Sequence, residues 1–376
     1  MSIKQHKSSS LSRRDFLKSA AALGAGLTFA QSSLPQAAYA QSAVAEVEFW
    51  DMVWGPPEYI ETAQKLVDQF NESQSAIKVT YQSTPWSNWY QTFLTAIGSG
   101  TAPDVSTGAG YQAVQFFDFG AIMPLDDLVA DMKADGSADD FLPGLVDRLT
   151  YQDQHVALPW AIDIRVPYYR KDLYEAAGIS SPTTWDEFAA ATKATTSGEQ
   201  YGMVIPSAAT VLGSHNLFMF MFNNGGGFFA EDGSLDVMNE RNVETMQFFA
   251  NMVKDGSIHP GSAGFGDSDA DKAFLQSTAA TFVRGPGLET REDMAEIKDQ
   301  VGLMSPLASS HNTYGTIFWI NNMMVYTQTE NPDATLTFLK WYSENQKPLW
   351  TEGHTGQMPT RSSFASDPYF QDNPYT

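Results

Sequence analysis

Strand-like and helix-like segments alternate along the first part of the chain, and this order constrains the fold more than any other feature. Residues 46–49 and 77–82 alternate apolar and polar side chains, as half-buried strands do. Helical spacing follows each of them, over residues 56–70 and 86–97, and residues 103–105 begin a third strand that ends in a glycine loop. This β-α-β-α-β order predicts a parallel or mixed sheet covered by helices, an α/β fold.

A second set of strands and helices follows, and the length of 376 residues favours about two domains. Thr184 should accept a hydrogen bond from the N–H of Glu187, whose carboxylate would reach back to the N-cap of the same helix. The other expected elements are strands at 166–169, 281–283, near 301 and at 318–326, and a helix with Val243, Met246, Ala250 and Val253 on one face.

The first forty residues have the features of an export signal. Basic residues precede a weakly apolar stretch from Phe16 to Ala30, and Ala38-Tyr39-Ala40 fits an A-x-A cleavage site. The segment Ser12–Lys18, with its arginine pair, resembles the twin-arginine signal. We expect residues 1–40 to be removed and the mature protein to lie in the periplasm, without a lipid anchor because no cysteine follows the signal.

Charge and composition exclude several classes of protein. The chain has 22 basic and 44 acidic residues and no cysteine. Residues 1–40 hold five of the basic residues and one acidic residue, so the mature chain keeps 17 basic and 43 acidic residues, a net charge of −26. Such a chain offers no positive field to nucleic acid, and it has no disulfides or thiolate ligands. A mean hydropathy of −0.28 argues against a membrane-spanning protein.

Several short segments carry a family resemblance through their order along the chain. They are Gly100–Val105 (GTAPDV), Gly120–Leu125 (GAIMPL), Leu158-Pro159, Tyr168–Gly178 (YYRKDLYEAAG), Pro182–Glu187 (PTTWDE), Gly225-Gly226, Ala273-Phe274 and Gly353–Pro359 with its Gly-x-x-Pro ending. The ordered set resembles the extracellular solute-binding proteins of family 1, the maltose-binding-protein type that serves carbohydrate ABC importers. The resemblance covers essentially all of the mature chain.

The resemblance implies a two-lobe periplasmic binding protein fold of type II, with a ligand cleft between α/β lobes that crossing hinge segments join. It assigns residues 41–162 and 302–328 to the first lobe, and residues 163–301 and 329–376 to the second. Family members usually continue for several dozen residues past the Gly-x-x-Pro segment. We therefore expect the C-terminal part of the second lobe to be truncated at Thr376.

Loops at the ends of first-lobe strands supply candidate ligand contacts. Sugar sites combine flat aromatic faces with polar groups that bond to hydroxyls. Trp54 is interpretable either as a ligand contact or as a core aromatic, and both roles stay open for Trp86 at the start of its helix, whereas Trp89 is expected in the core. By position in the resemblance, the candidates of this lobe are Asp51, Trp54, Trp86, Tyr111 and Gln112.

The first crossing segment and the second lobe supply the remaining candidates. The family places a ligand-contacting carboxylate at the position of Asp163, and Arg165 would share its face and either pair with it or contact the ligand. Many family members have Trp where this chain has Gly287, so the resemblance implies the loss of a stacking platform and disfavours a long linear oligosaccharide. The other candidates are Asn223, Arg284, Gly285, Trp319 and Asn321.

Catalytic and metal-binding patterns are weak. Neighbouring acids such as Asp126-Asp127 cannot flank a scissile bond, which disfavours a secreted glycosidase. The glycine loop Gly108–Ala113 lacks the acidic partner of a dinucleotide site, and residues 267–278 lack the Gly and Glu of a calcium loop.

These observations together predict a periplasmic substrate-binding protein of an ABC importer. It would bind a mono- or short oligosaccharide by hinge closure and deliver it to the membrane permease, as a monomer, without catalysis, cofactor, metal or nucleic acid. The alternative ligand is an anionic sugar derivative or a glycerol-phosphate-like molecule, held by Arg165 or Arg284. Pairing of these arginines with acidic residues is the competing interpretation.

Overall fold

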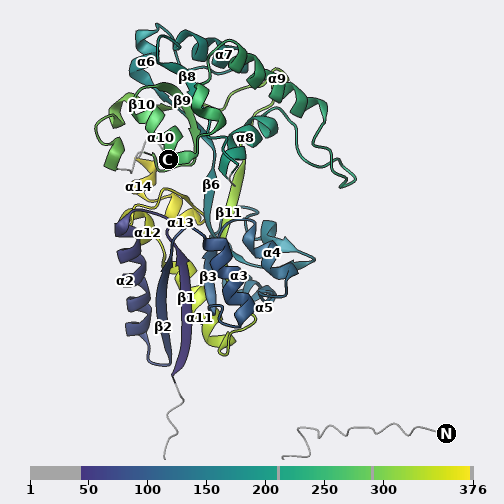
Figure 1. Ribbon diagram of the computed structural model, residues 1–376. Helices are drawn as coiled ribbons and strands as arrows, with labels where there is room; N and C mark the ends of the chain where they lie inside the picture. The colour runs from purple at the N-terminus through teal and green to yellow at the C-terminus, as the bar shows by residue number, and fades with distance from the viewer. Residues whose placement is uncertain (1–43, 210–211, 289–291, 373–376) are drawn as a thin grey trace, which may run out of the picture. The chain divides into compact units, whose positions relative to one another are not determined.

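Two main sheets organise the part of the chain that the computed structural model describes, residues 44–209, 212–288 and 292–372. The predicted signal, residues 1–40, lies outside the described residues. We call the residues around the six-stranded sheet the first lobe and those around the four-stranded sheet the second lobe. Figure 1 shows β6 (Leu158–Ile164) and β11 (Phe318–Val325) side by side where the chain passes between the lobes.

The first sheet has the mixed arrangement that the alternating segments predict. In order across the sheet, its strands are β12 (Met358–Pro359), β6, β11, β3 (Val105–Gly108), β1 (Ala45–Met52) and β2 (Ile77–Thr84). β1 is parallel to β2 and β3, and such parallel neighbours need helical crossovers. β11 runs antiparallel to both β3 and β6.

Helices cover both faces of the first sheet because successive side chains of β1 point to opposite sides. The helices of this lobe are α2 (Pro57–Ser73), α3 (Trp89–Ser99), α4 (Gln112–Asp118), α5 (Asp126–Asp135) and α11 (Pro332–Asn345). Phe49 packs against Phe338 of α11, with ring centroids 5.4 Å apart. Its neighbour Trp50 packs against Phe93 of α3 at 5.5 Å. A short hairpin, β4 (Thr150–Tyr151) and β5 (Gln154–His155), precedes β6.

The C-terminal segment packs in the first lobe, which corrects the expected assignment of residues 329–376 to the second. After α11 come α12 (Pro348–Thr351), α13 (Ser362–Ala365) and α14 (Pro368–Gln371). Their large apolar side chains join the core around β1, and β12 extends the first sheet beside β6. Aromatic packing explains this placement, since Tyr342 meets Phe49 of the first sheet edge-to-face and Trp350 stacks on Trp160 of the same sheet.

The second lobe is built on the strands β10 (Val301–Leu303), β7 (Val166–Arg170), β9 (Ala279–Arg284) and β8 (Tyr201–Val204), in that order. Its helices are α6 (Lys171–Ala176), α7 (Trp185–Ala194), α8 (His215–Asn223), α9 (Glu240–Lys254) and α10 (Asp267–Leu275). Thr184 caps α7 as predicted, accepting from the Glu187 N–H at 3.2 Å. The Glu187 carboxylate bonds to the N–H and hydroxyl of Thr183, one residue before the expected partner.

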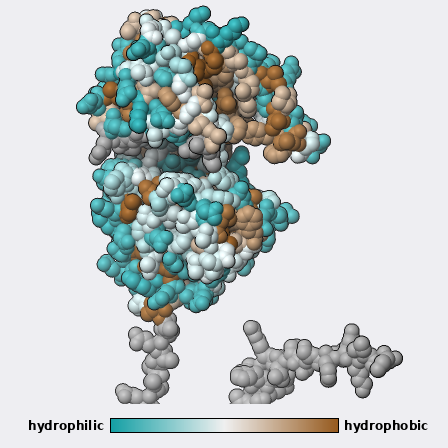
Figure 2. All heavy atoms as spheres, in the orientation of Figure 1, coloured by the Kyte–Doolittle hydropathy of each residue, from teal (hydrophilic) through white to brown (hydrophobic). Residues whose placement is uncertain are grey.

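Helix α9 presents to solvent the apolar face that its sequence predicts. Val243, Met246 and Val253 are exposed, whereas Phe249 and Met252 on another face are buried. Exposed apolar residues continue along the nearby loop, at Phe229, Leu235 and Met238. Figure 2 shows apolar side chains gathered on this side of the second lobe.

The crossing from the first lobe to the second is short. β6 ends at Ile164 and β7 begins at Val166, so Arg165 alone separates the strands of the two sheets. Its backbone N–H donates to the carbonyl of Ile317, which precedes the returning strand β11, at 3.2 Å. The two crossing segments are therefore tied together at the point where the lobes meet.

Candidate ligand-binding cleft

A cavity of about 730 Å³ lies between the two lobes, where Figure 2 shows the surface hollowed. The first lobe contributes loops after β1 and β3, and the second lobe contributes the starts of α8 and α10 and the end of β9. Residues of the crossing strands lie between these two sets. The volume is within the usual range for small-molecule sites.

Four aromatic side chains of the first lobe form what we call the aromatic wall: Trp54, Trp86, Trp89 and Tyr111. The ring centroid of Trp86 lies 4.9 Å from that of Trp54 and 5.5 Å from that of Trp89, both edge-to-face. The Trp86 indole N–H donates to the Val53 carbonyl at 2.7 Å, and the side chain is 41% exposed. Trp89, expected only in the core, therefore also lines the cavity.

Trp54 is held by a buried polar network behind the wall. Its indole N–H donates to Oγ1 of Thr107 at 3.0 Å, and Thr107 donates to Oδ1 of Asp51 at 2.6 Å. Tyr59 donates to the other carboxylate oxygen at 2.8 Å. Asp51 is 0% exposed, and burial raises its pKa to about 7. Asp51 thus lies behind Trp54 and not in the lining, which corrects its prediction as a ligand contact.

Gln112 also supports the cavity from behind. Its side-chain oxygen accepts the N–H of Ala109 at 3.1 Å, and the residue is buried. A Cβ on Gly108 would lie 2.5 Å from that same oxygen, so the glycine is required for this contact. Gln112 therefore fixes the loop that carries Tyr111, and the structure does not place it in the lining as predicted.

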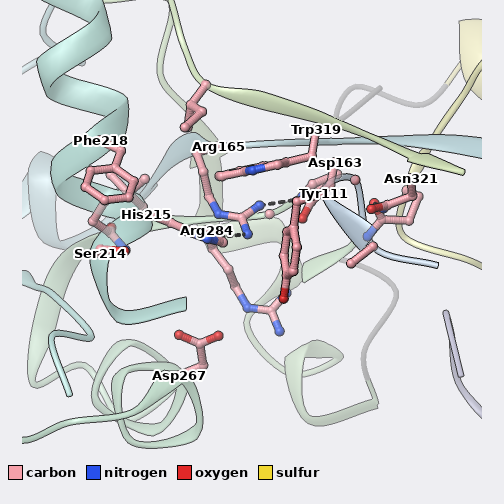
Figure 3. Close-up of a pocket in the computed structure, with 18 of the residues that line it drawn as sticks. Tyr111, Asp163, Arg165, Ser214, His215, Phe218, Asp267, Arg284, Trp319 and Asn321 are labelled. Atoms are coloured by element: carbon pink, nitrogen blue, oxygen red, sulfur yellow. Dashed lines mark hydrogen bonds and ion pairs between the residues drawn. The ribbon is translucent and has the colours of Figure 1, made fainter. Parts of the chain in front are cut away.

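The crossing segments bring Asp163, Arg165 and Trp319 together with His215 at the start of α8, and Figure 3 shows this cluster. Arg165 Nη1 donates to Oδ1 of Asp163 at 2.5 Å, and Nη2 donates to Nδ1 of His215 at 2.9 Å. The guanidinium carbon of Arg165 lies 4.8 Å from the ring centroid of Trp319. The ring centroid of His215 lies 4.2 Å from the same Trp319 centroid. The ion pair that the sequence left open for Arg165 is therefore formed, and it lies within the cavity.

His215 is uncharged at neutral pH. Burial and the adjacent charge of Arg165 lower its pKa to about 4. Because Nδ1 accepts a hydrogen bond from Arg165, the ring proton lies on Nε2. His215 therefore offers the cavity a hydrogen-bond donor and a flat ring without adding positive charge.

The second arginine of the cleft is also paired. Nε of Arg284 donates to Oδ1 of Asp271 at 2.8 Å. Asp267, at the start of α10, lines the same cavity, and burial raises its pKa.

Gly285 allows the ion pair of Asp163 and Arg165 to approach the backbone of the second lobe. A Cβ on Gly285 would lie 3.0 Å from Asp163 Oδ1 and 3.1 Å from Arg165 Nη1.

Two asparagines of α8 have different roles from those the sequence suggests. Asn223, a predicted ligand contact, is 1% exposed and bonds to Trp185 Nε1 at 2.7 Å and to the Leu307 carbonyl at 2.9 Å, inside the second lobe. Asn216 was not predicted, yet it lines the cavity. Its side chain is 2% exposed, and its Oδ1 accepts no hydrogen bond among the described residues.

The lining near the C-terminal loop includes a contact between two glycines. Asn321 lines the cavity and donates to Oε1 of Gln357 at 3.2 Å. A Cβ on Gly287, whose φ is +85°, would lie 2.3 Å from Cα of Gly356. The position at which the resemblance expects an aromatic platform is thus in backbone contact with the opposite lobe.

Nine of the twelve predicted residues line the cavity: Trp54, Trp86, Tyr111, Asp163, Arg165, Arg284, Gly285, Trp319 and Asn321. Of the other three, Asp51 and Gln112 lie behind the lining, and Asn223 is buried inside the second lobe. Sequence reasoning missed Trp89 and the lining residues of the second lobe, chiefly His215, Asn216, Phe218, Phe228 and Asp267. No sequence motif pointed to His215 or Asn216, because their place in the lining depends on how α8 packs against the crossing strands.

The described residues contain no group of three or more His, Cys, Asp or Glu side chains arranged to hold a metal ion. Across the same part of the chain, none of the helices combines the length and apolar character that crossing a membrane requires.

A ligand cavity between two α/β lobes that short crossing strands connect defines a two-lobe binding protein. The family model for bacterial extracellular solute-binding proteins matches residues 56–347, and the chain belongs to that family. This confirms the predicted family and fold. A twin-arginine signal sequence matches residues 10–30, which together with the family places the protein in the periplasm.

Known relatives extend over most of the chain. A sugar transporter from Arthrobacter chlorophenolicus A6, solved with bound laminaribiose, is 36% identical with a TM-score of 0.79, over 88% of this chain and 83% of that one. A putative binding protein of Brucella abortus is 26% identical over 94% of this chain and 84% of its own length. The sn-glycerol-3-phosphate-binding periplasmic protein of Rhizobium meliloti is 26% identical over 66% of this chain and 60% of its own length.

Proposed function

We propose that this protein captures an uncharged short saccharide in the cleft and presents it to the membrane permease of an ABC importer, without chemical change. The observation that carries the proposal is the aromatic wall, which lines one cavity together with the paired and hydrogen-bonding groups of Arg165, Asp163 and His215. Flat rings suit the apolar C–H faces of sugar rings, and the polar groups suit hydroxyls. The laminaribiose bound to the Arthrobacter transporter supports the same ligand class.

The charges in the cleft favour a neutral ligand over an anionic one. Arg165 is paired with Asp163 and Arg284 with Asp271, so neither guanidinium brings uncompensated positive charge. Besides these two paired carboxyl groups, Asp267 supplies a third, which lines the cavity. An anion would have to replace a carboxylate already bound to an arginine, which costs the energy of a desolvated ion pair. These pairs disfavour the glycerol-phosphate-like alternative.

The same pairing supports binding without catalysis. Glycoside hydrolysis needs one carboxylic acid that donates a proton and a second carboxylate on the other side of the bond. Asp163 is held at 2.5 Å by the Arg165 guanidinium, an arrangement that suits a fixed hydrogen-bond acceptor. Family membership likewise points to a binding protein.

Binding by closure follows from the two-lobe arrangement. The cavity takes groups from both lobes, so a ligand can satisfy them together only when the lobes are close. A ligand that binds the closed state more tightly shifts the population toward it, by no more than its difference in affinity for the two states. The short crossing at Arg165 is the natural hinge.

A binding panel tests this proposal. Residues 41–376 would be titrated with laminaribiose, maltose, glucose, glucuronate, glucose 6-phosphate and sn-glycerol 3-phosphate, using thermal shift and calorimetry. A ligand at 100 times its dissociation constant should stabilise the folded state by about 2.7 kcal/mol. We expect a neutral saccharide to stabilise the protein and to be recovered unchanged. Stabilisation by the phosphorylated compounds alone, or consumption of the sugar, would contradict the proposal.

A further inference from the structure

The loops that carry Gly287 and Gly356 meet at one edge of the cleft. Gly287 follows β9 of the second lobe, and Gly356 precedes β12 of the first lobe. A Cβ built on Gly356 would lie 2.7 Å from Cα of Gly287 and 3.0 Å from the carbonyl oxygen of Pro286. The two backbones are therefore in van der Waals contact with no side chain between them.

Each loop is anchored in its own lobe, so the contact is not between two loose segments. In the first lobe, Trp350 Nε1 donates to the Gln357 carbonyl at 2.7 Å, and Thr355 Oγ1 donates to the Trp54 carbonyl at 3.0 Å. In the second lobe, Leu288 is fully buried directly after Gly287. The position of the contact thus follows from the packing of both lobes.

The contact also forms part of the boundary of the cavity. Pro286 and Gln357, the immediate chain neighbours of the two glycines, both line it. Because touching backbones leave no gap, a ligand cannot extend between these loops. A further sugar ring placed between the Gly287 and Gly356 loops would have to push the lobes apart. Forcing extra volume into a packed site costs free energy.

We propose that the Gly287–Gly356 contact closes this end of the cleft and sets an upper limit on the length of the saccharide that the protein binds. This inference rests on the proposed function and adds to it a determinant of ligand length. The absence of both Cβ atoms is what permits the contact, so the limit should disappear when one is restored.

The decisive variant is Gly356→Ala. The φ angle of Gly356 is outside the positive range, so alanine meets only the steric conflict with Gly287 and Pro286. Gly98→Ala is the matched control, since a Cβ there, on the exposed side of α3, has no atom within 4 Å. Thermal melts would verify that both variants fold.

The experiment measures dissociation constants by calorimetry for the series from laminaribiose to laminaripentaose and for the malto-oligosaccharides of the same lengths. The unmodified protein and Gly98→Ala should bind the short members and lose roughly ten- to hundredfold in affinity beyond a limiting length. In Gly356→Ala the short members should weaken by about tenfold while the long members do not, so the length preference shrinks.

Three results would contradict the inference in different ways. Equal affinity of the unmodified protein for all lengths would overturn the length limit even if Gly356→Ala failed to fold. An equal loss at every length in Gly356→Ala would show that the contact serves closure and does not select length. Absence of binding by any saccharide of either series would instead overturn the proposed function, and the length limit with it.

Discussion

What a side chain in the cleft can offer a ligand depends on which hydrogen-bond and ion-pair partners it already has. Arg165 bonds to Asp163 and His215, and Arg284 bonds to Asp271, so each of these candidate cations is paired with a carboxylate. Asn216 is the reverse case, because its buried Oδ1 accepts no hydrogen bond from the described residues. A buried acceptor without a donor costs free energy, and because Asn216 lines the cavity we expect a bound saccharide to supply the donor.

Substituting Asn216→Leu should therefore change binding and stability in opposite directions. Loss of a hydrogen bond to ligand should weaken saccharide binding by roughly 5- to 100-fold, whereas the ligand-free protein should keep or increase its stability because no unpaired acceptor is buried. Calorimetry and urea unfolding measure the two quantities.

Asn223→Leu is the matched control for that substitution, on the same helix. It removes bonds to Trp185 and Leu307 and should lower the free energy of unfolding by about 2 kcal/mol or more. If Asn216→Leu destabilised the ligand-free protein as much as this control, Asn216 would be a structural residue.

At the scale of secondary-structure elements, strand ends hold the aromatic wall through hydrogen bonds that run between strands. Thr107 on β3 has two acceptor positions, taken by the N–H groups of Met52 and Trp54, so its own proton must go to Asp51 on β1. Asp51 in turn accepts from Tyr59 of α2. The orientation of Trp54 is thus decided by a network whose members lie on three different elements.

Asp51→Asn should flatten part of the pH dependence of stability. The pKa of Asp51 is raised to about 7 in the folded protein, so the unfolded chain loses this proton at lower pH than the native state does. The stabilisation of the folded state by protonated Asp51 is fully present below the ordinary carboxyl pKa. It is lost as the pH rises toward 7, by up to about 1.4 kcal/mol per pH unit. Asparagine does not titrate, so the stability of the unmodified protein relative to Asp51→Asn should fall over this range.

Urea unfolding of both proteins at several pH values between about 4 and 8 would measure this difference. Asp68→Asn, on the exposed side of α2, provides a control for the loss of one surface carboxylate. Parallel pH profiles for the unmodified protein and Asp51→Asn would contradict the assignment of a shifted pKa to this residue.

For the whole molecule, two features dominate: an excess of negative charge and a cleft that both lobes build. Without the expected signal of residues 1–40, the sequence has 17 basic and 43 acidic residues, and the ion pairs described above use only some of them. Self-repulsion of this magnitude favours expansion over the compact state. The cleft itself is close to charge-balanced, so this repulsion acts on stability more than on the ligand.

We expect salt to stabilise the mature protein. Raising sodium chloride from about 10 mM to about 150 mM shortens the screening length from roughly 30 Å to roughly 8 Å. The melting temperature should then rise by roughly 2–5 °C. The affinity for a neutral saccharide should change by less than about twofold. Scanning calorimetry and isothermal titration at both salt concentrations measure these effects; a melting temperature that falls with salt would contradict the expectation.

The sequence by itself determined the local and repetitive features of this protein. Period-two alternation predicted β1 and β2, Thr184 predicted the start of α7, and the ordered segments predicted the family and its two-lobe fold. Through the family resemblance, and through loops that follow strands of the first lobe, it also named nine residues that line the cleft.

Only the tertiary structure decided which lobe buries the C-terminal helices and which polar residues face the ligand cavity. Asp51 and Asn223 occupy the expected loop and helix, yet their side chains turn inward to bond with partners far away in the sequence. Gln112 also turns inward, where it accepts from the nearby Ala109 N–H. The contact of Gly287 with Gly356 likewise joins segments that no local pattern relates. Local patterns record the preferences of neighbouring residues, whereas pairing, burial and the closing of a cleft depend on contacts between distant segments, which exist only once the chain has folded.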